Sequence, residues 1–125
     1  MKYRVQNSVG PEHQILDDSK HKDGKNPTHR SASLHDLVAT PDDKPIKAVG
    51  EWNQSKIVAK GPIPEHWLND KKVMTIDQTS EVWRDRFGKS KYKNKKDFGA
   101  ASAPILLQDH FDPVWFRNIR IEELK

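Results

Sequence analysis

The chain has 125 residues, of which 34% are hydrophobic and 32% are charged, and its formal net charge is +4. This length suits a single domain, which we place over residues 1–125. The chain contains no cysteine, which excludes disulfides, thiolate metal sites and cysteine nucleophiles. No apolar run approaches the roughly 20 residues of a membrane-spanning helix, so we expect no membrane partner.

The N-terminal part predicts short strands separated by turns. Residues 1–5 and 12–16 have a strand-like composition, and the turn signal Val9-Gly10-Pro11 lies between them. Residues 17–30 are polar throughout and predict a long loop without a core of its own. Residues 33–38 form a brief ordered piece after it.

The middle of the chain predicts a strand and a hairpin. Residues 51–60 indicate a strand that ends at Gly61-Pro62. The pair Asn69-Asp70 separates two runs of aromatic and branched residues, which is typical of a β-hairpin.

A short helix is predicted at residues 80–87, because Val82, Trp83 and Arg86 recur at helical spacing. Ser80 is a suitable N-cap, and Gly88 is expected to end the helix.

The C-terminal part predicts two further strands, at residues 105–108 and 114–121, with a turn at 109–113 between them. Alternation places Trp115, Arg117, Ile119 and Ile121 on one face of the second strand. Many short strands with Gly, Pro and Asn turns indicate an all-β antiparallel sandwich with one short helix near 80–87.

Four stretches occur together in a specific order and spacing. They are Glu-His-Gln-Ile-Leu-Asp-Asp at 12–18, Gly-Glu-Trp-Asn at 50–53, Glu-His-Trp-Leu-Asn at 65–69, and Leu-Gln-Asp-His at 107–110 leading into Pro-Val-Trp-Phe-Arg-Asn-Ile at 113–119. Together they resemble the 3-keto-disaccharide hydrolase domain family, over nearly the whole chain. The resemblance implies a concanavalin-like jelly roll that binds carbohydrate on its concave sheet and cleaves glycosides oxidised to a ketone at sugar carbon 3.

The sequence departs from the family pattern in two places. The family domain opens with strands upstream of those seen here, so we expect a C-terminal portion whose N-terminal strands are missing and whose sheets self-associate through strand edges. Ala103-Pro104-Ile105-Leu106 replaces the usual Gly-His-Ile-Gly, and Phe111 replaces a Gly. Family members are typically periplasmic or secreted, whereas Met1 leads into a strand without a signal peptide.

Elimination from a 3-keto sugar needs a base for the proton on carbon 2, a group that stabilises the enolate, and an acid for the leaving group. Glu12 is the candidate base, and Gln14 shares its strand face and could orient a hydroxyl. His110 is the candidate acid, base or metal ligand, and Arg4 could hold the oxyanion. The alternatives are that Glu12 is a carboxylate on the solvent-exposed surface, that His110 is a hydrogen-bonded turn residue, and that Arg4 belongs to an ordinary surface salt bridge.

Further candidates for substrate binding are Gln108, which alternates onto the face of His110, then His66 and Arg117. Packing is the alternative for His66, which lies beside Trp67 and Leu68, and a buried structural role is the alternative for Arg117.

Asp17 and Asp18 open the long loop and could bind calcium with further oxygen ligands, or they could form a solvated turn. His21, His29 and His35 are too scattered to indicate a metal site by spacing.

Two other functions stay open beside the hydrolase. One is a non-catalytic carbohydrate-binding module or an inactive fragment. The other is nucleic-acid binding by the lysine-rich loop at residues 89–97, which includes Tyr92. We favour a solvated loop there and expect no nucleic-acid partner.

Overall fold

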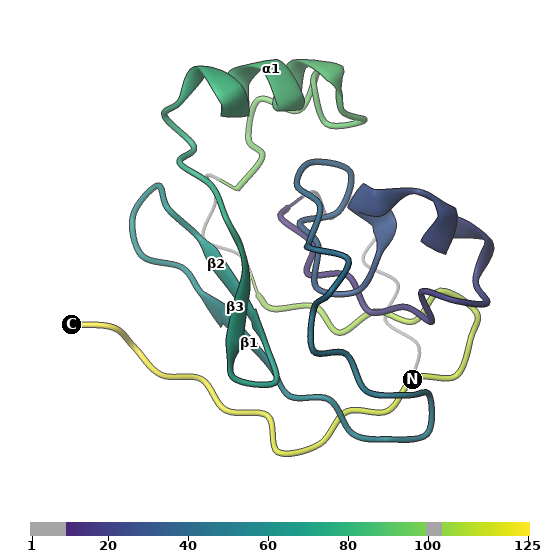
Figure 1. The fold of residues 1–125 in the computed structure, drawn as a ribbon. Coiled ribbons are helices and arrows are strands. Elements are labelled where there is room, and N and C mark those ends of the chain that lie inside the picture. Colours follow the sequence, from purple (N-terminus) through teal and green to yellow (C-terminus); the bar gives the residue numbers. More distant parts are fainter. Residues whose placement is uncertain (1–9, 100–103) are drawn as a thin grey trace.

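The computed structural model describes residues 10–99 and 104–125 (Figure 1). The predicted strand at 1–5, with Arg4, lies outside the described residues. The elements in chain order are the 3-10 helices η1 (Lys22–Lys25) and η2 (Pro27–His29), the strands β1 (Ser55–Val58), β2 (Glu65–Leu68) and β3 (Lys71–Thr75), and the helix α1 (Glu81–Lys89).

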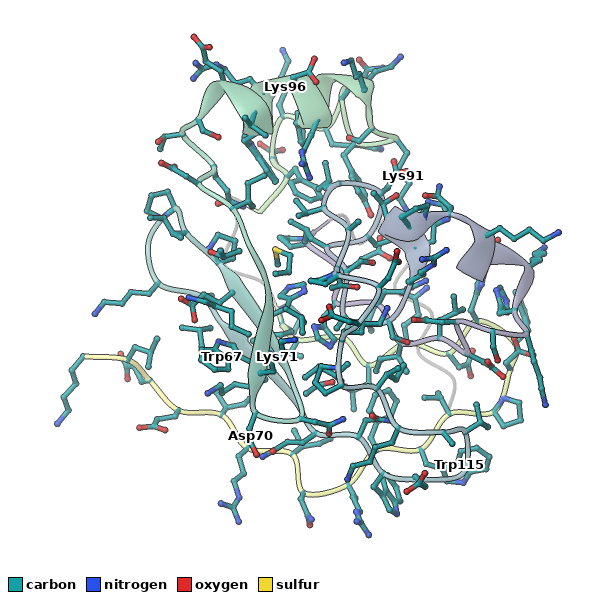
Figure 2. All side chains as sticks on the ribbon, in the orientation of Figure 1. Trp67, Asp70, Lys71, Lys91, Lys96 and Trp115 are labelled. Atoms are coloured by element: carbon teal, nitrogen blue, oxygen red, sulfur yellow. The ribbon has the colours of Figure 1, made fainter. Side chains whose placement is uncertain are left out.

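The three strands form one antiparallel sheet in the order β1-β2-β3. The predicted hairpin is confirmed, because Asn69 and Asp70 are the two residues between β2 and β3. Both have positive φ, 46° and 65°, as the preferred two-residue hairpin turns require. Figure 2 shows Asp70 at the tip of the hairpin.

The segment before the sheet is held by short backbone pairings. His13 bridges Leu34, and the N–H of Gln14 donates to the carbonyl of Ser33 at 3.2 Å. The predicted strand at 12–16 is therefore a single bridge rather than a full ladder.

The predicted loop at 17–30 has more local structure than we expected. It contains both 3-10 helices, which are capped by the side chains of His21 and Asn26. Pro27 opens η2, where its missing N–H costs nothing. Side-chain caps and a proline thus order a segment that has little apolar surface to bury.

Helix α1 begins as predicted, since the hydroxyl of Ser80 accepts from the N–H of Trp83 at 3.1 Å. Its predicted end at Gly88 is wrong, because Gly88 is helical and Ser90 is the C-cap. The N–H of Ser90 donates to the carbonyl of Phe87, and its hydroxyl donates to the same carbonyl at 2.8 Å. These bonds satisfy a terminal carbonyl without a glycine in the left-handed region.

The main core lies between the sheet, the N-terminal part and α1. Its buried members are Leu34, Leu37, Val38, Met74, Ile76 and Tyr92, and Trp83, Phe87 and Phe98 pack against them. A smaller cluster joins Ala32, Leu68 and Val73. The hairpin and the N-terminal part are therefore held together by apolar contacts at two places.

Residues 104–125 carry neither helix nor strand, so the predicted strands at 105–108 and 114–121 are not formed. A strand needs a neighbour for its hydrogen bonds, and none of β1, β2 and β3 pairs with this segment. In Figure 1 its yellow-green start crosses the middle of the molecule, and its yellow end runs along the lower edge to the C-terminus. The antiparallel sheet is thus established, while the second sheet of a sandwich stays a prediction.

Within the described ranges, no helix has the length and apolarity that crossing a membrane would require.

Candidate functional site

A group of ionisable side chains gathers where the N-terminal part meets the loop after α1. We call it the Glu12 cluster, and its members are Glu12, His29, His35, Asp36, Lys91 and Tyr92. Backbone pairing places Glu12 opposite His35, because the N–H of His35 donates to the carbonyl of Glu12 at 3.1 Å. Lys91 and Tyr92 follow the end of α1, and Figure 2 shows Lys91 between α1 and the 3-10 helices.

Glu12 is the carboxylate of this cluster that faces a tyrosine and a lysine. The hydroxyl of Tyr92 donates to Oε1 of Glu12 at 2.5 Å, and Nζ of Lys91 lies 3.4 Å from the same oxygen. The Glu12 side chain is 36% exposed, so a ligand can reach it. Burial, and then the hydrogen bond to Glu12, raise the pKa of Tyr92, so this phenol stays protonated and remains a donor.

The other side of the cluster holds the loop on which Lys91 and Tyr92 lie. Asp36 accepts from the N–H of Lys91 at 2.7 Å, and its other oxygen lies 3.3 Å from Nε2 of His29. Burial alone would raise the pKa of Asp36, but these hydrogen bonds outweigh it and hold the pKa below its usual value. Asp36 therefore stays charged and fixes the position of Lys91.

His35 is a neutral member of the cluster. Burial, followed by the charge of Lys91, lowers its pKa. Its ring lies 4.4 Å from the ring of His29, and its Nδ1 is buried without a hydrogen-bond partner in the described part of the chain. These two histidines are separated in sequence, yet folding brings them together.

A groove with a volume of about 290 Å³ lies on another side of the same segment. Its polar lining includes Gln14, Asn53 and Ser55, and Glu12 is not among the lining residues. We expected Glu12 and Gln14 to share a strand face. The segment instead makes a single bridge at His13, so strand alternation does not extend along it.

The predicted calcium ligands Asp17 and Asp18 also line this groove, but protein groups occupy their oxygens. Asp17 accepts from the N–H and the hydroxyl of Ser19 and from the N–H of Lys20. Asp18 accepts from the N–H of Ser31 at 2.7 Å and pairs with the buried Nζ of Lys44 at 2.6 Å. The lysine supplies positive charge beside Asp18, so these contacts give no support to a calcium site.

His66 is buried and belongs to the packing of the sheet against the N-terminal part. Its Nδ1 lies 2.8 Å from the carbonyl of Ala32, and its ring lies 4.6 Å from the ring of His13. Burial, followed by the charge of His66, lowers the pKa of His13 to about 3. The role of His66 in substrate binding stays a prediction.

The three candidates in the C-terminal segment lie apart from the Glu12 cluster and from the lining of the groove. Gln108 is exposed, and His110 lies beside His21 and Asp23. The guanidinium of Arg117 stacks over the ring of Trp52, 4.0 Å from its centre. This contact joins the C-terminal segment to the chain before β1.

Of the Glu12 cluster, the sequence indicated only Glu12 as a residue of the sugar site, and Lys91 and Tyr92 are among the members that it missed. The lysine-rich loop reads as a solvated surface, and Lys91 is indeed half exposed. The one available signal is Tyr92, an aromatic residue among lysines that becomes part of the core.

Comparisons with known proteins identify the family. The sequence model of a family described as a 3-keto-alpha-glucoside-1,2-lyase-like domain matches residues 1–122. The chain belongs to this family. A 3-keto-disaccharide hydrolase of Bacteroides thetaiotaomicron is 36% identical over an alignment 129 residues long, and the match covers 91% of this chain and 44% of that protein.

A solved structure from Parabacteroides distasonis, named as a glycosyl hydrolase, superimposes with a TM-score of 0.60 at 28% identity. The match covers 73% of this chain and 44% of that one. The chain thus spans under half the length of these relatives. The family membership predicted from the four sequence stretches is confirmed.

Proposed function

We propose that the protein acts on 3-keto-glycosides by removing the proton on sugar carbon 2 and eliminating the group on carbon 1. The electron pair of the broken C–H bond forms the double bond between carbons 1 and 2 as the glycosidic C–O bond breaks. The leaving oxygen takes a proton, and water then adds across the double bond to complete hydrolysis. The family match supports this chemistry, and the Glu12 cluster is the observation that carries it.

Glu12 is the proposed base, because its carboxylate is accessible and held by two neighbours. Tyr92 donates to it and keeps it oriented, and the raised pKa of Tyr92 rules the phenol out as a base near neutral pH. Lys91, 3.4 Å from the carboxylate, is a cation that could stabilise the enolate oxygen. We keep Arg4 as a second proposed oxyanion partner, and His110 as a proposed acid, base or metal ligand.

The finer features of fold and binding are also proposals. The jelly roll with carbohydrate on its concave sheet is supported by the antiparallel sheet and by the likeness to a glycosyl hydrolase structure. Gln14 is the binding candidate with direct support, because it lines the groove of about 290 Å³. His66, Gln108 and Arg117 are further proposed contacts with the sugar.

The test is a product assay by mass spectrometry with a 3-keto-disaccharide and with its unoxidised parent. We expect sugar release from the keto compound alone. Glu12→Gln should lower the rate by about 10²–10⁴-fold, the usual effect of losing a positioned base. The matched control is Glu81→Gln, since Glu81 is an exposed glutamate on α1 that should not affect turnover.

Proton abstraction has its own signature. A substrate deuterated at carbon 2 should react more slowly if this C–H bond breaks in the rate-limiting step. Equal release from both sugars, or equal rates for the Glu12→Gln and Glu81→Gln variants, would contradict the proposal. If the folded protein binds the keto sugar but does not cleave it, the protein is a carbohydrate-binding module rather than a hydrolase.

A further inference from the structure

One group of metal-ligating side chains lies outside the Glu12 cluster. One ligand atom from each of His21, Asp23 and His110 lies within 4.8 Å of the ligand atoms of the other two. His21 and Asp23 come from the start of η1, whereas His110 comes from the C-terminal segment. In residues 10–99 and 104–125, no second group of three such residues meets this distance.

We infer that His21, Asp23 and His110 bind a divalent transition metal ion and thereby fasten the C-terminal segment to η1. Two imidazoles and one carboxylate suit zinc and its neighbours better than calcium or magnesium, which prefer oxygen ligands alone. This inference does not depend on the proposed function, because its test measures binding rather than turnover.

The hydrogen bonds of His21 prepare one ring nitrogen for a metal. Nδ1 accepts from the N–H of Asp23 at 3.1 Å, so this nitrogen carries its lone pair. The same Nδ1 lies 3.8 Å from a carboxylate oxygen of Asp23. A metal ion at this position would replace the hydrogen bond by which His21 caps η1, and it would gain His21 and Asp23 as ligands.

Asp112 supplies the outer partner that metal-binding histidines usually have. Its Oδ2 lies 3.6 Å from Nε2 of His21, the nitrogen that carries the proton when Nδ1 is an acceptor. A carboxylate on that side fixes the ring orientation and makes Nδ1 a better donor to a metal.

The spacing requires only side-chain movement. Ligand atoms in a tetrahedral zinc site lie about 3.3 Å apart, given metal–ligand bonds of roughly 2.0–2.1 Å. His110 is exposed, so its ring can rotate to close the remaining gap. Asp23 and His21 are only partly buried, so water and the ion can reach them.

The site also has a structural consequence. Residues 104–125 make no strand, and their described links to the rest of the chain include the Asp112–His21 pair and the Arg117–Trp52 stack. A metal ion shared by η1 and His110 would add a strong link near the start of this segment. Metal binding should therefore protect the segment from proteolysis.

The experiment is calorimetric titration of the whole protein with zinc, with cobalt absorption spectra as a second readout. We expect one equivalent of zinc to bind, and a cobalt spectrum that indicates nitrogen and oxygen ligands in a four- or five-coordinate site. His110→Ala and Asp23→Asn should each weaken zinc binding at least tenfold. Zinc should slow cleavage of residues 104–125 in the unmodified protein but not in these two variants.

Asp43→Asn is the matched control, because Asp43 is an exposed aspartate away from this group. It should bind zinc as tightly as the unmodified protein. His110→Ala removes no described hydrogen bond, so it remains informative even if a change in η1 disturbs folding. Absence of zinc binding, or equal affinity in the His110→Ala and Asp43→Asn variants, would overturn the inference.

Discussion

At the scale of single residues, the buried histidine pair makes stability depend on pH. Burial and the neighbouring His66 lower the pKa of His13 from 6.5 to about 3, and burial lowers the pKa of His66 as well. Below pH 6.5 these histidines therefore bind protons in the unfolded chain but remain neutral in the folded chain. The contribution of the neutral histidines to the free energy of unfolding is fully present above pH 6.5, and it is lost as the pH falls toward 3.

We expect the free energy of unfolding to fall by up to about 1.4 kcal/mol per pH unit for each such histidine below pH 6.5. Urea denaturation at pH 7 and pH 5 measures this slope. His13→Gln should flatten it, whereas His110→Gln, which alters an exposed histidine, should leave it unchanged. An equal slope in the two variants would show that the burial of His13 does not govern the pH dependence.

The same scale shows why the sequence indicated Glu12 but not its partners. Glu12 lies in a stretch that resembles a known family, so the sequence of that stretch was enough to propose Glu12 as the base. Its contacts with Lys91 and Tyr92 join residues 79 and 80 positions apart. Such pairs depend on how the loop after α1 packs on the N-terminal part, and no local spacing encodes that packing.

At the scale of elements, the hairpin turn has a residue that the geometry does not favour. Asp70 has φ of 65°, a region in which glycine pays no steric penalty. Asp70→Gly should therefore raise the free energy of unfolding by up to about 1 kcal/mol. The measurement is thermal and urea denaturation of the two proteins.

The control for this turn is Asp43→Gly, because Asp43 is exposed and lies outside the left-handed region. There glycine should destabilise, since it only adds freedom to the unfolded chain. A loss of stability in the Asp70→Gly protein would mean that contacts of the Asp70 side chain outweigh its backbone strain.

Elements with local signals were predictable, and elements that need distant partners were not. The turn pair Asn69-Asp70 and the cap Ser80 fix the hairpin and α1 within a few residues. The alternating segment at 114–121 has the composition of a strand, yet its formation depends on a neighbour elsewhere in the chain. Composition cannot supply that neighbour, so the segment forms no strand and does not pair with the sheet.

At the scale of the whole molecule, β1 leaves one edge of the sheet exposed. β1 lies at one end of the strand order, and three of its four residues are exposed. Ile57 on this strand is 56% exposed. An exposed apolar edge strand offers unpaired backbone groups to a second copy of the chain.

We therefore predict concentration-dependent dimers in sedimentation velocity experiments. Ile57→Lys should weaken this association at least tenfold, because a lysine on an edge strand opposes pairing with another edge. Ile63→Lys changes a similarly exposed isoleucine outside the strands, at 48% exposure, and should associate like the unmodified protein. If the two variants associate equally, the contact runs through apolar surface in general, and the free edge of β1 is not the site of pairing.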